Sequence, residues 1–191
     1  LEYNADKLSG RVTVYSTNFS DFIYQQATGL EEDGLAVVAY RQEDATYYGI
    51  DAELTAQLRE WDGGQLELSL LLDWVNASLD VSGNDNIPRT PPLRFGVSAL
   101  GQWGPTTAEL SYLRVDSQTD DVAPQEFGTD GYYDLNLYLG YQIKISAQAN
   151  MEIFVHGKNL GDQEQRHHVS FIKDFAPAPG RTLLAGVRVS F

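Results

Sequence analysis

The residues of this sequence best suited to metal chemistry lie near its C-terminal end. His167 and His168 are adjacent, and Asp162 and Asp174 lie within a few residues of them. Imidazole nitrogen and carboxylate oxygen are ligands that suit zinc. The four side chains can meet only if this segment folds back on itself, and adjacent histidines on an extended strand point apart. We treat them as candidate metal contacts, with ordinary hydrogen bonding in a solvated loop as the alternative.

The remaining chemistry in the sequence is sparse. The third histidine, His156, has the same parity as Glu152 and Phe154, which predicts a polar wall position, and it is the last candidate metal contact. Ser170 lies near His168, but adjacency in sequence gives no triad geometry. The sequence contains no Gly-x-Ser-x-Gly, no His-Glu-x-x-His and no phosphate-binding glycine loop. We therefore expect no enzymatic activity.

Composition excludes other classes of protein. The 27 acidic and 13 basic residues give a formal charge of −14, which repels phosphate backbones and argues against nucleic-acid binding. Cysteine is absent, so the chain has no disulfide and no thiolate ligand. The longest apolar run is Leu70-Leu71-Leu72, far short of the roughly 20 residues of a spanning helix. Any membrane crossing must use strands.

Apolar and polar residues alternate along several segments, as they do on strands with two different faces. In the segment 66–75, for example, Leu66, Leu68, Leu70, Leu72 and Trp74 share one parity. The full set of predicted strands covers residues 11–22, 49–58, 66–75, 93–102, 107–116, 134–143, 151–158 and 182–191. The fold class predicted is all-β, with about eight antiparallel up-and-down strands.

The predicted connections differ in length. Short ones lie at 61–64, 103–105 and 146–150, and longer ones at 26–35, 79–90, 117–130 and 161–180. Outer-membrane barrels have this asymmetry, with short periplasmic turns and long external loops. Aromatic residues near the strand ends, such as Trp61, Trp74 and Trp103, are typical of girdles at the membrane interfaces.

Motifs near the C-terminus are more specific. Gly157-Lys158-Asn159-Leu160-Gly161-Asp162 is followed by Pro179-Gly180-Arg181 and then by an alternating segment that ends at Phe191. Together with Gly49-Ile50-Asp51-Ala52-Glu53, these motifs resemble the barrel of a TonB-dependent receptor. The segment 165–181 is similar to the corresponding loop of receptors associated with zinc uptake.

This resemblance implies an architecture and a location. The family's barrels have 22 strands around a plug, so residues 1–191 are expected to form the last third of such a barrel, without its plug and earlier strands. The resemblance implies a Gram-negative outer membrane, contact with its lipid, and contact with TonB through the absent plug segment. Phe191, at the end of an apolar stripe, is expected to be read by the barrel-insertion machinery or to anchor at the interface.

The resemblance also implies a function, which is energy-dependent uptake of a scarce nutrient such as zinc or a metal chelate. No resident cofactor is expected, and zinc would be the transported substrate. One alternative is a self-contained eight-stranded outer-membrane barrel with a structural or adhesive role. Another is a soluble β-domain that binds a ligand, since alternation is also found in strands packed on a soluble core.

Overall fold

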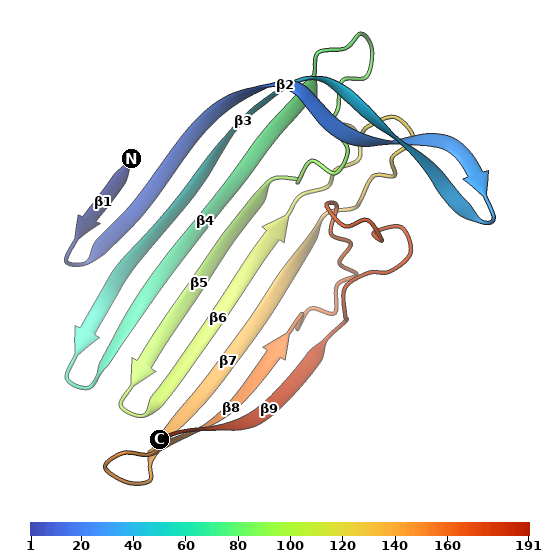
Figure 1. Cartoon of the computed structure of the whole chain (residues 1–191). Helices are drawn as coiled ribbons and strands as arrows, with labels where there is room; N and C mark the ends of the chain where they lie inside the picture. Colours follow the sequence, from blue (N-terminus) through green and yellow to red (C-terminus); the bar gives the residue numbers. More distant parts are fainter.

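The computed structural model describes all 191 residues and consists of one antiparallel sheet with its connections (Figure 1). The sheet has nine strands in the order of the sequence, and each strand pairs only with its neighbours in sequence. The strands are β1 (Glu2–Ala5), β2 (Leu8–Glu32), β3 (Leu35–Trp61), β4 (Gly64–Leu79), β5 (Arg94–Trp103), β6 (Thr106–Val115), β7 (Tyr132–Lys144), β8 (Asn150–Lys158) and β9 (Thr182–Ser190). No helix that could cross a membrane is present.

The connections fall at two ends of the sheet. Two-residue turns at 6–7, 62–63 and 104–105, and the 145–149 turn, lie at the end where β9 finishes (Figure 1). Three long external loops, residues 80–93, 116–131 and 159–181, lie at the opposite end. The predicted asymmetry of short turns and long loops is confirmed for six of these connections, and the turn at 6–7 is an additional one that was not predicted.

Two parts of the prediction need correction. The sheet has nine strands rather than eight, because the short strand β1 pairs with residues 8–11 of β2. Residues 26–35 are not a long loop, because β2 and β3 continue beyond the sheet as a two-stranded hairpin closed by Asp33 and Gly34. Both turn residues have a positive φ, which suits a tight hairpin turn. The hairpin bends at Asp21, where the pairing register shifts between Phe19 and Phe22.

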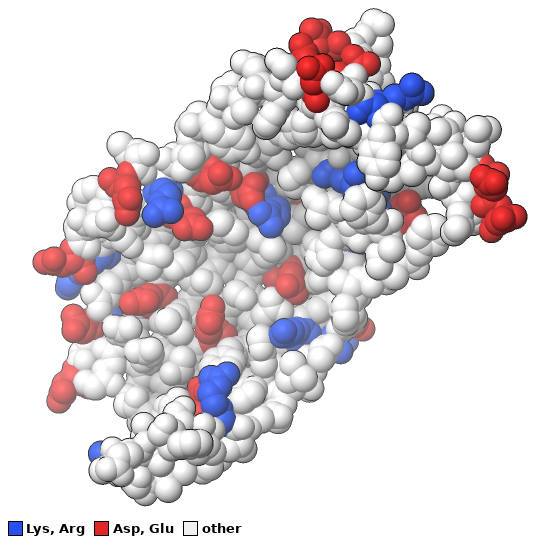
Figure 2. Space-filling view, viewed as in Figure 1, with Lys and Arg blue, Asp and Glu red and all other residues white.

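The two faces of the sheet have different chemistry. Asp51, Asp73 and Arg94 lie opposite one another on β3, β4 and β5, so their side chains share one face. Figure 2 shows acidic and basic side chains gathered in the hollow of that face, which we call the lumenal face. The other face carries exposed apolar side chains that include Val14, Leu54, Leu72, Phe95, Leu110, Leu139, Ile153 and Val187. An apolar band of this extent matches the lipid-facing side of a membrane barrel.

Aromatic side chains lie at both ends of the apolar face. The rings of Trp61 and Trp103 are 6.2 Å apart beside the short turns. Toward the external loops, Tyr48 and Trp74 are 5.6 Å apart and in edge contact. Aromatic groups at two levels of one sheet are the arrangement expected of girdles at the two membrane interfaces.

The sheet remains open, because β1 and β9 lie at opposite edges and do not pair (Figure 1). This disagrees with the alternative of a self-contained eight-stranded barrel, in which the first and last strands must close the cylinder. The small apolar core lies at the external end, where Ala45, Ala77, Leu79 and Ile87 pack together. The sheet below this core is a single layer.

Candidate functional site

The lumenal face carries a row of charges across four strands, β2 to β5. Asp51 and Asp73 lie directly opposite each other, and the Arg94 guanidinium forms an ion pair with Asp73. Arg11 joins the same row, and these side chains line a shallow pocket of about 350 Å³. The arginines offset the repulsion between paired carboxylates, so the row is a mixed rather than a purely acidic surface.

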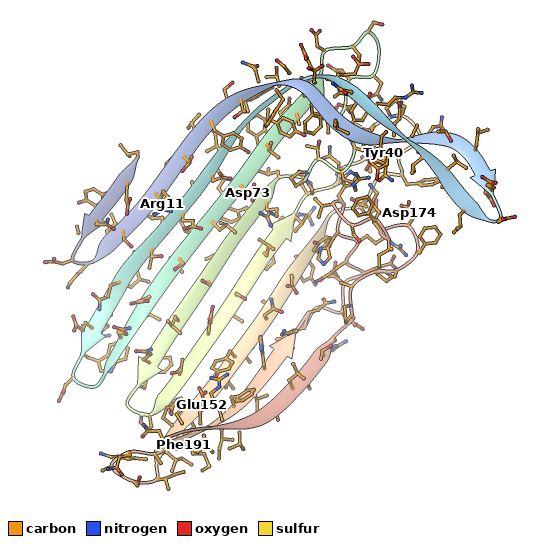
Figure 3. All side chains as sticks on the ribbon, in the orientation of Figure 1. Arg11, Tyr40, Asp73, Glu152, Asp174 and Phe191 are labelled. Carbon is orange, nitrogen blue, oxygen red and sulfur yellow. The ribbon has the colours of Figure 1, made fainter.

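Glu152 organises the other side of the lumenal face. Its carboxylate accepts a hydrogen bond of 2.6 Å from the Tyr138 hydroxyl and one of 2.8 Å from Arg188. These contacts join β7, β8 and β9 above the plane of the sheet. Figure 3 shows Arg11, Asp73 and Glu152 along this face, with Asp174 at the external end and Phe191 at the opposite end.

The three external loops pack against one another. Asn84 and Asn86 donate hydrogen bonds of 2.9 and 3.2 Å to the Val122 carbonyl, which joins the 80–93 loop to the 116–131 loop. The backbone N–H of Arg89 donates to Glu126, and the Arg89 guanidinium lies 4.1 Å from the centre of the Phe171 ring. Contacts between all three loops therefore make one loop assembly.

The centre of this assembly is a buried polar group that we call the Glu126 cluster, comprising Glu126, Thr129, His168 and Lys173. The Lys173 ammonium donates to the Glu126 carboxylate at 2.7 Å, and His168 Nε2 lies 3.4 Å from the same oxygen. The Thr129 hydroxyl lies 3.0 Å from His168 Nδ1. The side chains of Glu126, His168 and Lys173 are 9%, 1% and 5% exposed, so their contacts with one another replace contacts with water.

Burial lowers the pKa of His168 to about 4, and the positive charges of Lys173 and Arg89 act in the same direction, while Glu126 opposes them. The imidazole is therefore neutral at pH 7, as a buried group beside an ammonium must be. No local pattern in the sequence indicates Glu126 and Lys173, which meet across 47 residues.

The structure separates the four candidate metal contacts of the 159–181 loop. His167 is exposed and its Nδ1 lies 2.8 Å from the Tyr132 hydroxyl, whereas His168 points into the Glu126 cluster. The adjacent histidines thus point apart. Asp162 pairs with Arg181 at 3.3 Å, and Asp174 is exposed. No three histidine or carboxylate side chains lie together in a group that could hold a metal ion.

His156 lies in the wall rather than in a loop. It is on β8, where it pairs with Tyr138 of β7 and its ring meets the tyrosine ring edge to face at 5.9 Å. This places His156 on the same face as Glu152, as its parity predicts. His156 therefore belongs to a different element from His167 and His168, which lie in the 159–181 loop.

The C-terminal motif residues close the base of the 159–181 loop. Asn159 is buried with a positive φ, and its side chain donates to the carbonyls of Gln163 and Pro179 at opposite ends of the loop. Asp162 also has a positive φ and accepts a hydrogen bond of 2.9 Å from the backbone N–H of Arg181. Leu160 covers Gly157 on the preceding strand, and Gly180 lies against the Asp162 carboxylate. The motif therefore ties the end of β8 to the start of β9.

The family assignment rests on the match of residues 1–160 with the family model described as TonB dependent receptor-like, beta-barrel. The chain belongs to this receptor family. Members are transporters of the Gram-negative outer membrane and not enzymes, so the predicted family, fold and location are confirmed. No curated protein matches the chain.

Two solved structures share its architecture. The copper transporter OprC superposes with a TM-score of 0.76 at 21% identity, over 99% of this chain and 30% of OprC. The ferric-catecholate import receptor Fiu from E. coli K12, in its closed form, superposes with a TM-score of 0.58 at 16% identity, over 96% of this chain and 25% of Fiu. The chain therefore spans less than a third of either protein, and the likeness concerns the fold.

Proposed function

We propose that this chain is the C-terminal portion of the barrel of a TonB-dependent receptor that imports a scarce nutrient, either a metal ion or a metal chelate. The family match over residues 1–160 is the observation that carries this proposal. The limited coverage of OprC and Fiu supports a longer parent barrel, with the plug and earlier strands supplied by other residues.

The arrangement of the loops and lumenal face suits such a role. The external loop assembly stands at one end of a wall whose inner face is charged and whose outer face is apolar. A charged wall hydrates a passage for a polar solute. Contact with TonB would come through the plug. The apolar stripe of β9, which includes Leu183, Val187 and Val189, would serve recognition by the insertion machinery.

For the substrate, we propose a metal ion and take zinc as the first ion to test. His167 and Asp174 are exposed and can reach a solute, whereas His168 is buried in the Glu126 cluster and the carboxylate of Asp162 is paired with Arg181. A solute that brings its own ligands could be held by these two side chains alone, so a metal chelate remains the other form. Copper is the second ion to test, because the structural relative OprC is described as a copper transporter.

Uptake measurements on cells that carry the whole receptor test this proposal. We expect zinc accumulation that depends on TonB and falls about tenfold or more in the double variant His167→Ala, Asp174→Ala. Glu164→Ala removes an exposed carboxylate of the same loop that is not a candidate contact, so it is the matched control and should leave the accumulation near its original level. TonB-dependent uptake of copper or a ferric chelate but not zinc would overturn the choice of ion, and no TonB-dependent uptake of any of them would overturn the proposed transport.

A further inference from the structure

Over strands β4 to β9, the apolar face of the sheet carries a single charged side chain, Arg114. On β6, Arg114 pairs with Phe95 of β5 and with Tyr133 of β7, and Phe95 pairs in turn with Leu72 of β4. The other residues of these six strands that share this face are uncharged. In a chain with a formal charge of −14, the one charge on this part of the face is therefore a cation.

Arg114 lies at the depth of the membrane interface. The 116–131 loop begins where β6 ends, at Val115, so Arg114 is at the external end of its strand. The stacked rings of Tyr112 and Tyr133, whose centres are 5.8 Å apart, lie on the same face beside it. A lipid-facing cation is costly at the bilayer midplane and costs little near the interface. This depth is also where lipid headgroups lie.

The guanidinium of Arg114 is only weakly neutralised within the protein. Its one ion pair is with Asp116 at 3.8 Å, which is longer than a hydrogen bond, and its side chain is 47% exposed. Asp116 Oδ1 already accepts a hydrogen bond of 2.9 Å from the Ser117 backbone N–H. A guanidinium presents its N–H donors in a planar fork that fits a phosphate group. Arg114 therefore offers donors to an anion at headgroup depth.

A crevice of about 250 Å³ lies at the same end of the sheet, between β4 and the 80–93 and 116–131 loops. Asp116, the ion-pair partner of Arg114, is one of its lining residues. Trp74 of the external aromatic pair is another. The polar side chains of its wall include Asn76, Asn86, Asp116, Gln118 and Asp121. The crevice thus joins the cation of the apolar face to a polar wall.

Hydrogen-bond acceptors dominate this wall. The Gln118 amide donates to the Asp121 carbonyl at 2.7 Å, and the Asn86 amide donates to the Val122 carbonyl at 3.2 Å. The amide oxygens of both side chains remain as acceptors, together with the carboxylates of Asp116 and Asp121. An acceptor-rich wall suits a ligand with many hydroxyl donors, such as a sugar, and repels a free anion.

We propose that Arg114 and this crevice together bind the headgroup of a phosphorylated glycolipid in the external leaflet of the outer membrane. The phosphate pairs with Arg114, and the sugar hydroxyls donate to the acceptors of the crevice. A lipid fits better than a soluble phosphate, because the neighbours of Arg114 on this face are Phe95 and Tyr133, which can pack against acyl chains. The headgroup site does not depend on which solute the receptor carries.

Lipid binding to the whole receptor tests the site. The receptor is titrated with lipid A, a phosphorylated disaccharide lipid, in neutral detergent, and native mass spectrometry measures the fraction that retains the lipid. Arg114→Gln should weaken the affinity about tenfold or more, because a hydrogen-bonded ion pair is lost. The matched control is Arg59→Gln, since Arg59 pairs with Leu66 on the same face of the sheet but at its opposite end. This variant should leave the affinity unchanged.

Two further lipids separate the phosphate from the sugar. Arg114→Gln should have no effect on lipid A whose phosphates have been removed. Asp121→Ala, in the crevice, should weaken the binding of lipid A but not of phosphatidic acid, which has a phosphate and no sugar. Arg114 and Asp121 are exposed, so both variants should fold, and an unchanged midpoint of urea unfolding checks this.

Three results would overturn the headgroup site. Equal losses in Arg114→Gln and Arg59→Gln would show a general attraction of the lipid to cations. Displacement of lipid A by inorganic phosphate would show a site for a free anion. An affinity for lipid A that Arg114→Gln leaves unchanged would show that Arg114 only anchors the wall at the interface.

Discussion

The sheet and the external loop assembly of this receptor are stabilised in opposite ways. Of the 110 backbone hydrogen bonds, 91 lie within the strands. Glu152 is nevertheless the only charged or polar residue of the strands that is buried. The loops have few backbone hydrogen bonds but bury Thr129, Asn159, Gln165, His168 and Lys173. Backbone pairing supports the wall, and specific side-chain contacts support the loops.

This difference predicts different tolerance to mutation. A strand should accept substitutions that respect the chemistry of its two faces, because its hydrogen bonds belong to the backbone. A loop held by a buried polar group should fail when one member of that group is removed. The following variants probe this contrast, beginning with the largest expected effect.

Glu126→Ala should release the loop assembly without disturbing the sheet. Removal of the carboxylate leaves the Lys173 ammonium buried without a counter-charge, which costs about 3–5 kcal/mol. Hydrogen exchange should rise in residues 159–181 and stay unchanged in residues 66–75. The control is Glu164→Ala, whose pair with Arg166 is exposed and should cost less than about 1 kcal/mol. Equal effects of the two variants would contradict the buried cluster as the main support.

A pair of neighbouring residues on β4 tests the two faces of the sheet. Leu70→Arg places a charge on the apolar face and should cost about 2–4 kcal/mol in a bilayer. Leu71→Arg lies on the lumenal face opposite Glu53 and should cost less than half as much, because the new cation gains a carboxylate neighbour. Unfolding of the receptor in lipid vesicles by urea measures both, and a reversed order would invert the assignment of faces.

A pair of glycines tests packing on the lumenal face. A Cβ added at Gly49 would lie 2.4 Å from the Tyr15 hydroxyl and 2.5 Å from the Trp74 carbonyl, whereas one at Gly96 meets its nearest atoms at 3.4 Å. Gly49→Ala should therefore cost about 1–3 kcal/mol. Gly96→Ala should stay within about 1 kcal/mol of the parent. The same unfolding measurement decides, and similar values would show that β3 moves to relieve the clash.

The smallest effect is expected at the base of the 159–181 loop. Hydrogen bonds from the Arg181 backbone N–H and side chain hold the pKa of Asp162 below its ordinary value of 3.8. Their contribution is complete above about pH 4 and is lost as the pH falls through the lowered pKa. Asp162→Asn should speed hydrogen exchange of the Arg181 amide by roughly two- to tenfold at pH 7. It should also remove the increase in exchange below pH 4 that this contact causes, and an unaltered acid profile would count against the contact.

Alternation predicted the part of the fold in which each strand has two different environments. Segments 49–58 and 66–75 lie within β3 and β4, with lipid-facing and lumenal residues as expected. The projecting hairpin was missed because residues 26–35 lie beyond the sheet. Neither face of the hairpin has to be apolar there, so its residues need not alternate. β1 was missed because four residues, Glu2–Ala5, are too few to show a period.

The candidate site was less predictable. The sequence placed His167 and His168 in the correct loop and indicated that adjacent histidines point apart. It could not indicate their partners, Tyr132 and Thr129, which lie 35 and 39 residues away. Loop contacts at such separations have no period, so Glu126 and Lys173 gave no signal. The roles of His167, His168, Asp162, Asp174 and His156 toward a metal stay predictions.

The order of the strands carries a consequence for assembly. Because each strand pairs only with its neighbours in sequence, the wall can grow one hairpin at a time, with each addition closing a short stretch of chain. The Glu126 cluster joins residues from three connections, so it can form only after β5 to β8 are in place. The outer surface would thus acquire its final shape last, when the wall beneath it is already complete.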